Sequence, residues 1–266
     1  MLANYSKYVF TRVLQRLGLS DLCLAVGRGG RAIIPNPPRV MKVFSERKYE
    51  ADFLADPSLQ VVLERAREAR TFWDVGANMG LFSILARDVN PELQVVSIEA
   101  STDFYEVLCR NWRLNPQSWT CLHVAVGDRD GVARMSRGLG GCDHVLTAAE
   151  EGTQRAVGES RPMMTLDHLA ELLGQDRIDL LKIDVEGMEL SVLRGASGLL
   201  EEGRIGAIVL EADEHDLRYG TSNSDLVAFL ASKNYRLDAA ASVHKGDANN
   251  CQVFAMDKTE LAVNAQ

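Results

Sequence analysis

Short apolar runs alternate with helix-compatible segments along most of this 266-residue chain, from Thr71 onward. Such alternation is typical of βαβ units, in which helices connect parallel strands and cover both faces of a sheet. The sequence therefore predicts an α/β fold with a doubly wound, mainly parallel sheet. The expected strands lie near Phe72–Val75, Gln94–Glu99, Cys121–Val126, Leu180–Asp184, Gly206–Glu211, Tyr235–Ala239 and Gln252–Met256.

Two segments do not follow this alternation, and we expect them to be additions to a core of residues 71–266. Residues 1–70 begin with apolar side chains at helical spacing from Tyr5 to Leu17, which predicts an amphipathic helix ending near Gly18 and an N-terminal helical cap. Residues 131–161 are rich in glycine near 138–141 and lack periodicity, which predicts an insertion of hairpin or loop character. We expect both additions to form the substrate side of the site.

A glycine-containing turn, D-V-G-A-N-M-G over residues 74–80, follows the first expected strand. Gly76 permits a tight turn and Gly80 a close approach of the next helix, at the strand end where open α/β sheets bind ligands. A dinucleotide-binding turn needs a second glycine where this chain has Asn78, so the turn disfavours a pyrophosphate. The carboxylate of Asp74 instead suits a ligand that carries an ammonium and a sulfonium, such as S-adenosylmethionine.

Glu99 ends the second expected strand, where an acidic side chain can accept hydrogen bonds from two ribose hydroxyls. A glycine-rich turn alone is compatible with an ordinary β–α connection. Together with Asp74 and Asn78, however, Glu99 predicts a nucleoside-cofactor site. An NAD(P)-dependent oxidoreductase is the alternative, and the residues of the turn argue against it.

A second block of motifs lies further along the chain. It comprises T-L-D at residues 165–167, K-I-D-V-E-G-M-E at 182–189 and L-R-G-A at 193–196. In this order after D-V-G-A-N, the motifs resemble those of the FkbM-type methyltransferases, over about residues 72–211. The resemblance implies a Rossmann-like class I methyltransferase fold with seven strands, the last antiparallel, and S-adenosyl-L-methionine as the cofactor.

The same resemblance implies positions for the cofactor. The 74–80 turn, Glu99 and Asp184 would hold it, and Ala125 and Val126 would lie near the adenine. The residues of the turn included in this expectation are Asp74, Gly76, Ala77, Asn78 and Gly80. One departure is that Asp213 stands where the family often has a histidine, so no role is carried over for a histidine there.

Methyl transfer requires an acceptor atom to be aligned with the methyl group and its proton to be removed. We expect Asp184, at the end of the fourth strand of the core, to position or deprotonate the acceptor, and capping of the next helix is the alternative. Glu211 is its expected companion, and His144 in the insertion is a candidate base near neutral pH. The two acids also offer oxygen ligands for Mg²⁺, but we favour satisfaction by the backbone or by Arg218 and assign no metal.

Two other charged residues of the K-I-D-V-E-G-M-E motif are expected to be structural. Lys182 lies in an apolar strand, where an unpaired ammonium is costly, so it should pair with a nearby acid. Glu186 precedes a glycine at an expected tight turn, so it should bond the backbone of that turn.

The composition of the chain limits the kinds of molecule that we expect it to bind. The formal net charge is −8 and basic residues form no run, which gives no electrostatic reason to expect a nucleic acid. The five cysteines are scattered and no segment has the length of a membrane span, so we expect a cytoplasmic protein without membrane insertion. The resemblance then implies a small-molecule acceptor, most often a hydroxyl of a polyketide, sugar or related natural product, and a non-catalytic scaffold is the alternative.

Overall fold

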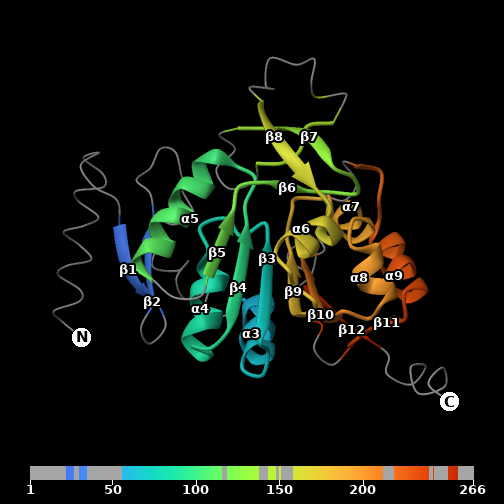
Figure 1. The fold of residues 1–266 in the computed structure, drawn as a ribbon, viewed down its shortest axis with the longest axis horizontal. Helices are drawn as coiled ribbons and strands as arrows, with labels where there is room; N and C mark the ends of the chain where they lie inside the picture. Colours follow the sequence, from blue (N-terminus) through green and yellow to red (C-terminus); the bar gives the residue numbers. More distant parts are fainter. Residues whose placement is uncertain are drawn as a thin grey trace.

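A seven-stranded sheet in the order β11-β12-β10-β9-β3-β4-β5 forms the core (Figure 1). The structure is a computed structural model that describes residues 22–26, 30–34, 56–115, 119–137, 143–147, 150, 158–211, 219–239, 242 and 251–256. β12 runs antiparallel to both of its neighbours and the other adjacent strands are parallel, which confirms the predicted sheet and its antiparallel last strand. The strands are β3 Thr71–Val75, β4 Gln94–Ile98, β5 Trp119–Leu122, β9 Ile178–Ile183, β10 Ile205–Glu211, β11 Tyr235–Leu237 and β12 Cys251–Met256.

Helices cover both faces of this sheet, because successive side chains of each strand point to opposite faces. Phe72 packs in the apolar cluster beneath α3, α4 and α5, whereas Trp73 and Val75 pack in the cluster beneath the later helices. No helix in the described ranges combines the length and the apolar character needed to cross a membrane. The helices are α3 Pro57–Ala66, α4 Leu81–Val89, α5 Thr102–Leu114, α6 Leu166–Leu172, α7 Glu189–Arg194, α8 Ser197–Glu201 and α9 Asn223–Ser232.

Short polar residues fix where several of these helices begin. Asp56 accepts a hydrogen bond from the backbone N–H of Ser58 at 2.8 Å, and Pro57 occupies the first turn of α3, where its missing N–H costs nothing. Thr165 caps α6 in the same way, and Ser222 begins α9 with a capping box.

A second, three-stranded sheet in the order β6-β8-β7 lies at one end of the main sheet (Figure 1). Its strands β7 Gly131–Met135 and β8 Glu159–Met164 pair antiparallel, as in a hairpin, and the division of the chain into core and insertion stays a prediction. β6, Ala125–Val126, pairs in parallel with β8. The prediction of one strand over Cys121–Val126 is therefore wrong, because β4 ends opposite Leu122 and β8 provides the backbone partners beyond that point.

The N-terminal segment contains a hairpin that the sequence analysis did not predict. β1 Leu22–Val26 and β2 Gly30–Ile34 pair antiparallel, and β2 lies beside α4 and α5. Two apolar runs separated by a glycine-rich turn are a hairpin signal, so the expectation of a purely helical cap is corrected here. The helix expected before Gly18 lies outside the described residues, and the division at residue 70 stays a prediction.

Candidate active site

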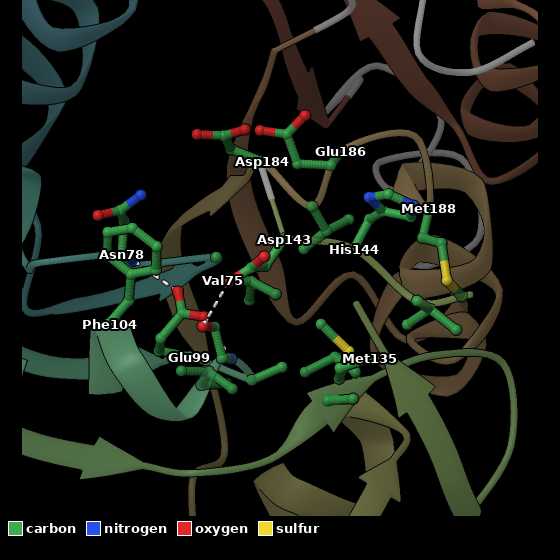
Figure 2. A pocket seen from close by; sticks show the side chains of 18 of the residues that line it. Val75, Asn78, Glu99, Phe104, Met135, Asp143, His144, Asp184, Glu186 and Met188 are labelled. Carbon is green, nitrogen blue, oxygen red and sulfur yellow. Dashed lines mark hydrogen bonds between the residues drawn. The ribbon is translucent and has the colours of Figure 1, made fainter. Parts of the chain in front are cut away.

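A cavity of about 640 Å³, partly open to solvent, lies at the carboxyl ends of β3, β4 and β9 (Figure 2). The core contributes Glu99 and Asp184 to its wall, and the insertion contributes Asp143 and His144. Glu186 also lines it, beside Asp184 in the view of Figure 2. This is the strand edge at which open α/β sheets bind ligands. The cavity therefore lies where the sequence placed the site, and acidic side chains dominate its charged lining.

The turn after β3 needs glycine at its first position. Gly76 has a φ of +76°, and a Cβ atom on it would lie 1.7 Å from the backbone oxygen of Asp184. Only a residue without a side chain allows β3 and β9 to end so close together. Asn78 also has a positive φ, 52°, which asparagine tolerates better than most residues, and its backbone N–H is thereby aimed at Glu99. Gly80 approaches Leu108 and Trp119, as the sequence predicted for a close helix contact.

Glu99 lies on the cavity wall although only 9 % of its surface is exposed. Its Oε2 accepts a hydrogen bond from the backbone N–H of Asn78, and its Oε1 accepts one from the N–H of Ser101, both at 2.7 Å. Burial, together with the nearby Asp143 and Asp184 carboxylates, raises the pKa of Glu99 to about 7 against the lowering effect of these two bonds. Each carboxylate oxygen keeps lone-pair capacity for a ligand hydroxyl.

A profile of the methyltransferase FkbM domain matches residues 74–237, which include the turn, Glu99 and Asp184. The chain belongs to the FkbM methyltransferase family. S-adenosylmethionine is the cofactor of this family, and the mostly parallel seven-stranded sheet with helices on both faces is the class I methyltransferase fold.

The relatives of this FkbM protein cover it only in part. It is 28% identical to the methyltransferase sdnD of Sordaria araneosa, over 46% of this chain and 58% of that protein. It is 26% identical to the hexuronic acid methyltransferase AglP of Haloferax volcanii, over 54% of this chain and 56% of that protein. The chain thus spans somewhat more than half the length of these relatives. The Pyrococcus abyssi tRNA (uracil-54, C5)-methyltransferase shares the fold with a TM-score of 0.50 and 14% identity, over 88% of this chain and 43% of that one.

Asp74 of the FkbM protein does not line the cavity, although the sequence analysis expected it to meet the cofactor directly. Adjacent strands place Ser97, Asp74 and Lys182 in register on one face of the sheet. Asp74 is fully buried there, and its Oδ2 accepts a hydrogen bond from Ser83 of α4 at 2.7 Å. Side chains two residues apart in a strand lie on the same face of the sheet, so Asp74 lies on the face of Phe72. That face packs beneath α3, α4 and α5, and the side chain of Asp74 therefore points away from the cavity.

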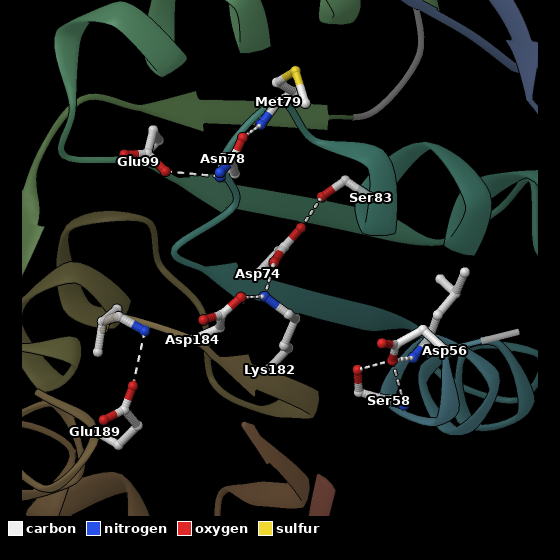
Figure 3. Close-up of polar contacts among 12 residues, drawn as sticks. Asp56, Ser58, Asp74, Asn78, Met79, Ser83, Glu99, Lys182, Asp184 and Glu189 are labelled. Carbon is white, nitrogen blue, oxygen red and sulfur yellow. Dashed lines mark hydrogen bonds and ion pairs between the residues drawn. The ribbon is translucent and has the colours of Figure 1, made fainter. Parts of the chain in front are cut away.

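Lys182 lies between Asp74 and the cavity-lining Asp184 and contacts both, as Figure 3 shows. Its Nζ atom lies 3.6 Å from Oδ1 of Asp74 and 3.0 Å from Oδ2 of Asp184, and 4.6 Å from the centre of the Phe82 ring. Lys182 itself is 2 % exposed, so the pairing expected from its apolar strand is confirmed with two acids. Burial raises the pKa of Asp74, and the charge of Lys182 opposes that rise. The side chain of Asp184 stays about one-third exposed, at 32%, on the cavity wall.

The helix after β9 is not capped by Asp184. Glu189 accepts hydrogen bonds from the backbone N–H groups of Val185 at 2.9 Å and Gly187 at 3.3 Å. The turn expected to be bonded by Glu186 is thus bonded by Glu189, and Glu186 lines the cavity with a positive φ of 57°. Both acids of the motif that precede Gly187, Asp184 and Glu186, line the cavity.

His144 lines the cavity, but the insertion holds its ring on both sides. Its Nδ1 lies 3.4 Å from the hydroxyl of Ser136 and its Nε2 lies 3.3 Å from Oε1 of Glu150. The residue is only 5 % exposed. As a base it must give up one of these two contacts.

The remaining predicted residues divide into three groups. Ala125 and Val126 line the cavity, and together with Phe104 they give it an apolar wall suited to an adenine ring. Ala77 and Gly80 belong to the turn but do not line the cavity. The side chain of Glu211, and all of Asp213, lie outside what the structure describes. Within the described ranges, no group of three His, Cys, Asp or Glu side chains is arranged to hold a metal ion.

The residues present fit the family's cofactor. Glu99 offers acceptors suited to ribose hydroxyls, the apolar wall suits a ring, and Asp184 and Glu186 offer the negative charge that an ammonium and a sulfonium need. The sequence analysis missed Ser101 and Asp143, which also line the cavity. Ser101 follows the strand-ending Glu99 by two residues and Asp143 precedes His144, so proximity to predicted site residues was the available signal.

Proposed function

We propose that this protein transfers a methyl group from S-adenosylmethionine to a hydroxyl of a small-molecule acceptor, such as a polyketide, sugar or related natural product. The observation that carries the proposal is a single cavity in which Glu99 and Asp184, from the ends of β4 and β9, face the same space beside the Gly76–Asn78 turn. The name of the relative AglP, a hexuronic acid methyltransferase, supports a sugar-like acceptor. The acidic lining supports a small molecule over a nucleic acid, since carboxylates repel phosphates.

The proposed cofactor side consists of core residues. The backbone of the turn and Glu99 hold the nucleoside, and Ala125 and Val126 contact the adenine. Asp74 acts indirectly, by fixing Lys182. When bound, the cofactor supplies an electrophilic methyl group, so the chain has to orient the acceptor and accept one proton.

Asp184 is the proposed acceptor-positioning residue or general base. Lys182 holds its Oδ2 at 3.0 Å, which orients Oδ1 as the acceptor for a ligand hydrogen. His144 and Glu211 are the proposed companions on the acceptor side, together with the insertion and the N-terminal segment.

The proposed location of the protein is the cytoplasm, which its scattered cysteines favour.

Two measurements test this function. The wild-type protein should bind S-adenosylhomocysteine by calorimetry and be stabilised by it against heat, because a ligand that binds only the folded state raises stability, whereas NAD should do neither. Binding of NAD in place of S-adenosylhomocysteine would favour the oxidoreductase alternative. Tritiated methyl transfer from S-adenosylmethionine to a panel of phenols, sugars and hydroxy acids then tests catalysis.

In that assay, Asp184→Asn should keep most of the affinity for S-adenosylhomocysteine, because Glu186 still offers a carboxylate to the ammonium. Turnover should fall by about 10²–10⁴-fold, the usual effect of removing a general base. Asp176→Asn is the matched control, because Asp176 is exposed and lies just before β9, whereas Asp184 lies just after it. Normal turnover by the folded Asp184→Asn protein would show that the carboxylate only anchors Lys182.

A further inference from the structure

The insertion reaches the cavity through a short segment, residues 143–147, that β7 holds in place. The backbone N–H of Ser136 donates to the oxygen of His144 at 2.8 Å, and the N–H of Leu146 donates to the oxygen of Arg134 at 2.7 Å. Met135 and Val145 form a β-bridge between these two bonds. Asp143, immediately before this bridge, is thereby brought to the cavity wall on the side of Glu99.

Asp143 and Glu99 converge on one residue. The hydroxyl of Ser101 donates to Oδ2 of Asp143 at 2.9 Å, while the backbone N–H of Ser101 donates to Oε1 of Glu99 at 2.7 Å. Ser101 occupies the N-cap position of α5, yet its hydroxyl bonds Asp143 instead of the helix. Two carboxylates this close repel each other, and the charge of Asp143 contributes to the raised pKa of Glu99. Hydrogen-bond donors from a ligand would relieve that repulsion.

The bond between Asp143 and Ser101 is not needed to anchor the insertion. Glu159 of β8 accepts hydrogen bonds from the backbone N–H of Thr102 at 2.9 Å and from its hydroxyl at 2.6 Å. Arg161 of the same strand donates to the backbone oxygen of Ala100 at 2.9 Å. These contacts fix β8 of the insertion on both sides of Ser101 without the bond from Asp143.

We propose that Asp143 is a second ribose-binding residue, which accepts a hydrogen bond from one ribose hydroxyl of the cofactor while Glu99 accepts one from the other. This inference rests on the proposed function. A ribose offers two adjacent O–H donors, and two carboxylates held side by side by Ser101 present one acceptor to each. The insertion would then complete the nucleoside site as well as face the acceptor.

Calorimetry with S-adenosylhomocysteine and with its 2′-deoxy and 3′-deoxy analogues tests the inference. Asp143→Ala should weaken binding of S-adenosylhomocysteine by roughly ten- to a hundredfold, as expected for loss of a hydrogen bond to a charged group, and Asp143→Asn should lose less. For one of the two deoxy analogues, Asp143→Ala and the wild type should bind equally. For the other deoxy analogue, Glu99→Ala and the wild type should bind equally.

Asp103→Ala is the matched control. Asp103 also joins α5 to the insertion, through Arg137 at 2.9 Å, but it does not line the cavity, so this variant should bind S-adenosylhomocysteine like the wild type. If Asp143→Ala loses affinity equally for all three ligands, or for none, Asp143 is not a ribose ligand and the inference is wrong. If the wild type fails to bind S-adenosylhomocysteine at all, the proposed function falls first and the inference with it.

Discussion

Asp74 and Glu99 are acids near the carboxyl ends of the neighbouring parallel strands β3 and β4, yet the structure gives them opposite surroundings. Asp74, within β3, points beneath α4 into a buried polar row that Ser97, Ser83 and Lys182 complete. Glu99 follows the last residue of β4 and accepts its hydrogen bonds from backbone N–H groups on the cavity wall. We call the first region the buried row and the second the nucleoside rim.

The difference teaches that an acid near a strand end is not by that fact a ligand. Within a strand, alternation decides which face a side chain takes, and Asp74 shares its face with Phe72. One residue beyond a strand, alternation no longer holds the side chain, so Glu99 can turn toward the cavity. We therefore expect changes in the buried row to alter stability, and changes in the nucleoside rim to alter ligand binding and its pH dependence.

The largest effect is expected for Lys182→Met, which removes the one described cation between Asp74 and Asp184. Breaking a buried ion pair on one side leaves an uncompensated charge, so the variant should lose about 3–5 kcal/mol in its free energy of unfolding, measured with urea at pH 7. The double variant Asp74→Asn/Lys182→Met should recover much of that loss, because neither charge is then buried alone. A single variant as stable as the wild type would contradict the description of the row as a charge-paired unit.

A second effect concerns the pH dependence of stability at the nucleoside rim. The pKa of Glu99 rises from 4.5 to about 7 on folding, so between these values the folded state binds more protons than the unfolded state. Stability contributed by Glu99 is therefore lost as pH rises from about 4.5 toward 7, by about 3 kcal/mol at 1.36 kcal/mol per unit of pKa. The carboxylates that face Glu99, Asp143 and Asp184, act in the same direction.

Urea unfolding of the wild type and of Glu99→Gln at pH 5 and pH 8 measures this contribution. The glutamine amide of the variant carries no charge at either pH, so the stability of the variant relative to the wild type should rise by up to about 3 kcal/mol at the higher pH. The change of this difference with pH is the informative quantity, since an altered hydrogen bond adds only a constant offset. A difference that is the same at both pH values would show that Glu99 is already ionised at pH 5.

The fold was largely predictable because strands buried on both faces leave strong apolar runs, and β3, β4, β9, β10 and β12 match the expected ones closely. One failure lies where partners distant in sequence decide the outcome. Whether Ala125 and Val126 continue β5 or pair with β8 depends on a strand more than thirty residues later. The hairpin of β1 and β2 was hidden by the expectation of a helix nearby.

The site was predictable where a motif fixes backbone geometry, as at Gly76 and Asn78, whose positive φ angles suit these residue types. It was not predictable where strand register decides. That Asp74 faces Lys182 follows from the pairing of β3 with β9, which no local pattern reveals. Asp143 reaches the cavity only because β7 carries it there, so its role stays a proposal that the sequence did not suggest.

The smallest effect is expected from a pair of serine variants, one in each region. Ser83→Ala removes the hydroxyl that bonds Asp74 at 2.7 Å and contacts the hydroxyl of Ser97 at 2.6 Å. It should lower the free energy of unfolding by about 1–2 kcal/mol, the range for a hydrogen bond to a charged group less the better helix propensity of alanine. The affinity for S-adenosylhomocysteine should stay within about twofold of the wild type, because a change of about 0.4 kcal/mol or less corresponds to that ratio.

Ser101→Ala is its counterpart in the nucleoside rim. It removes the hydroxyl that holds Asp143 but keeps the backbone N–H that bonds Glu99, so it should weaken S-adenosylhomocysteine binding by a few-fold and change stability less than Ser83→Ala does. Calorimetry measures the affinity of both variants for S-adenosylhomocysteine, and urea unfolding measures their free energy of unfolding. If Ser83→Ala instead weakened binding as much as Ser101→Ala, the buried row would be positioning the ligand through Lys182 and Asp184, and the two regions would act as one.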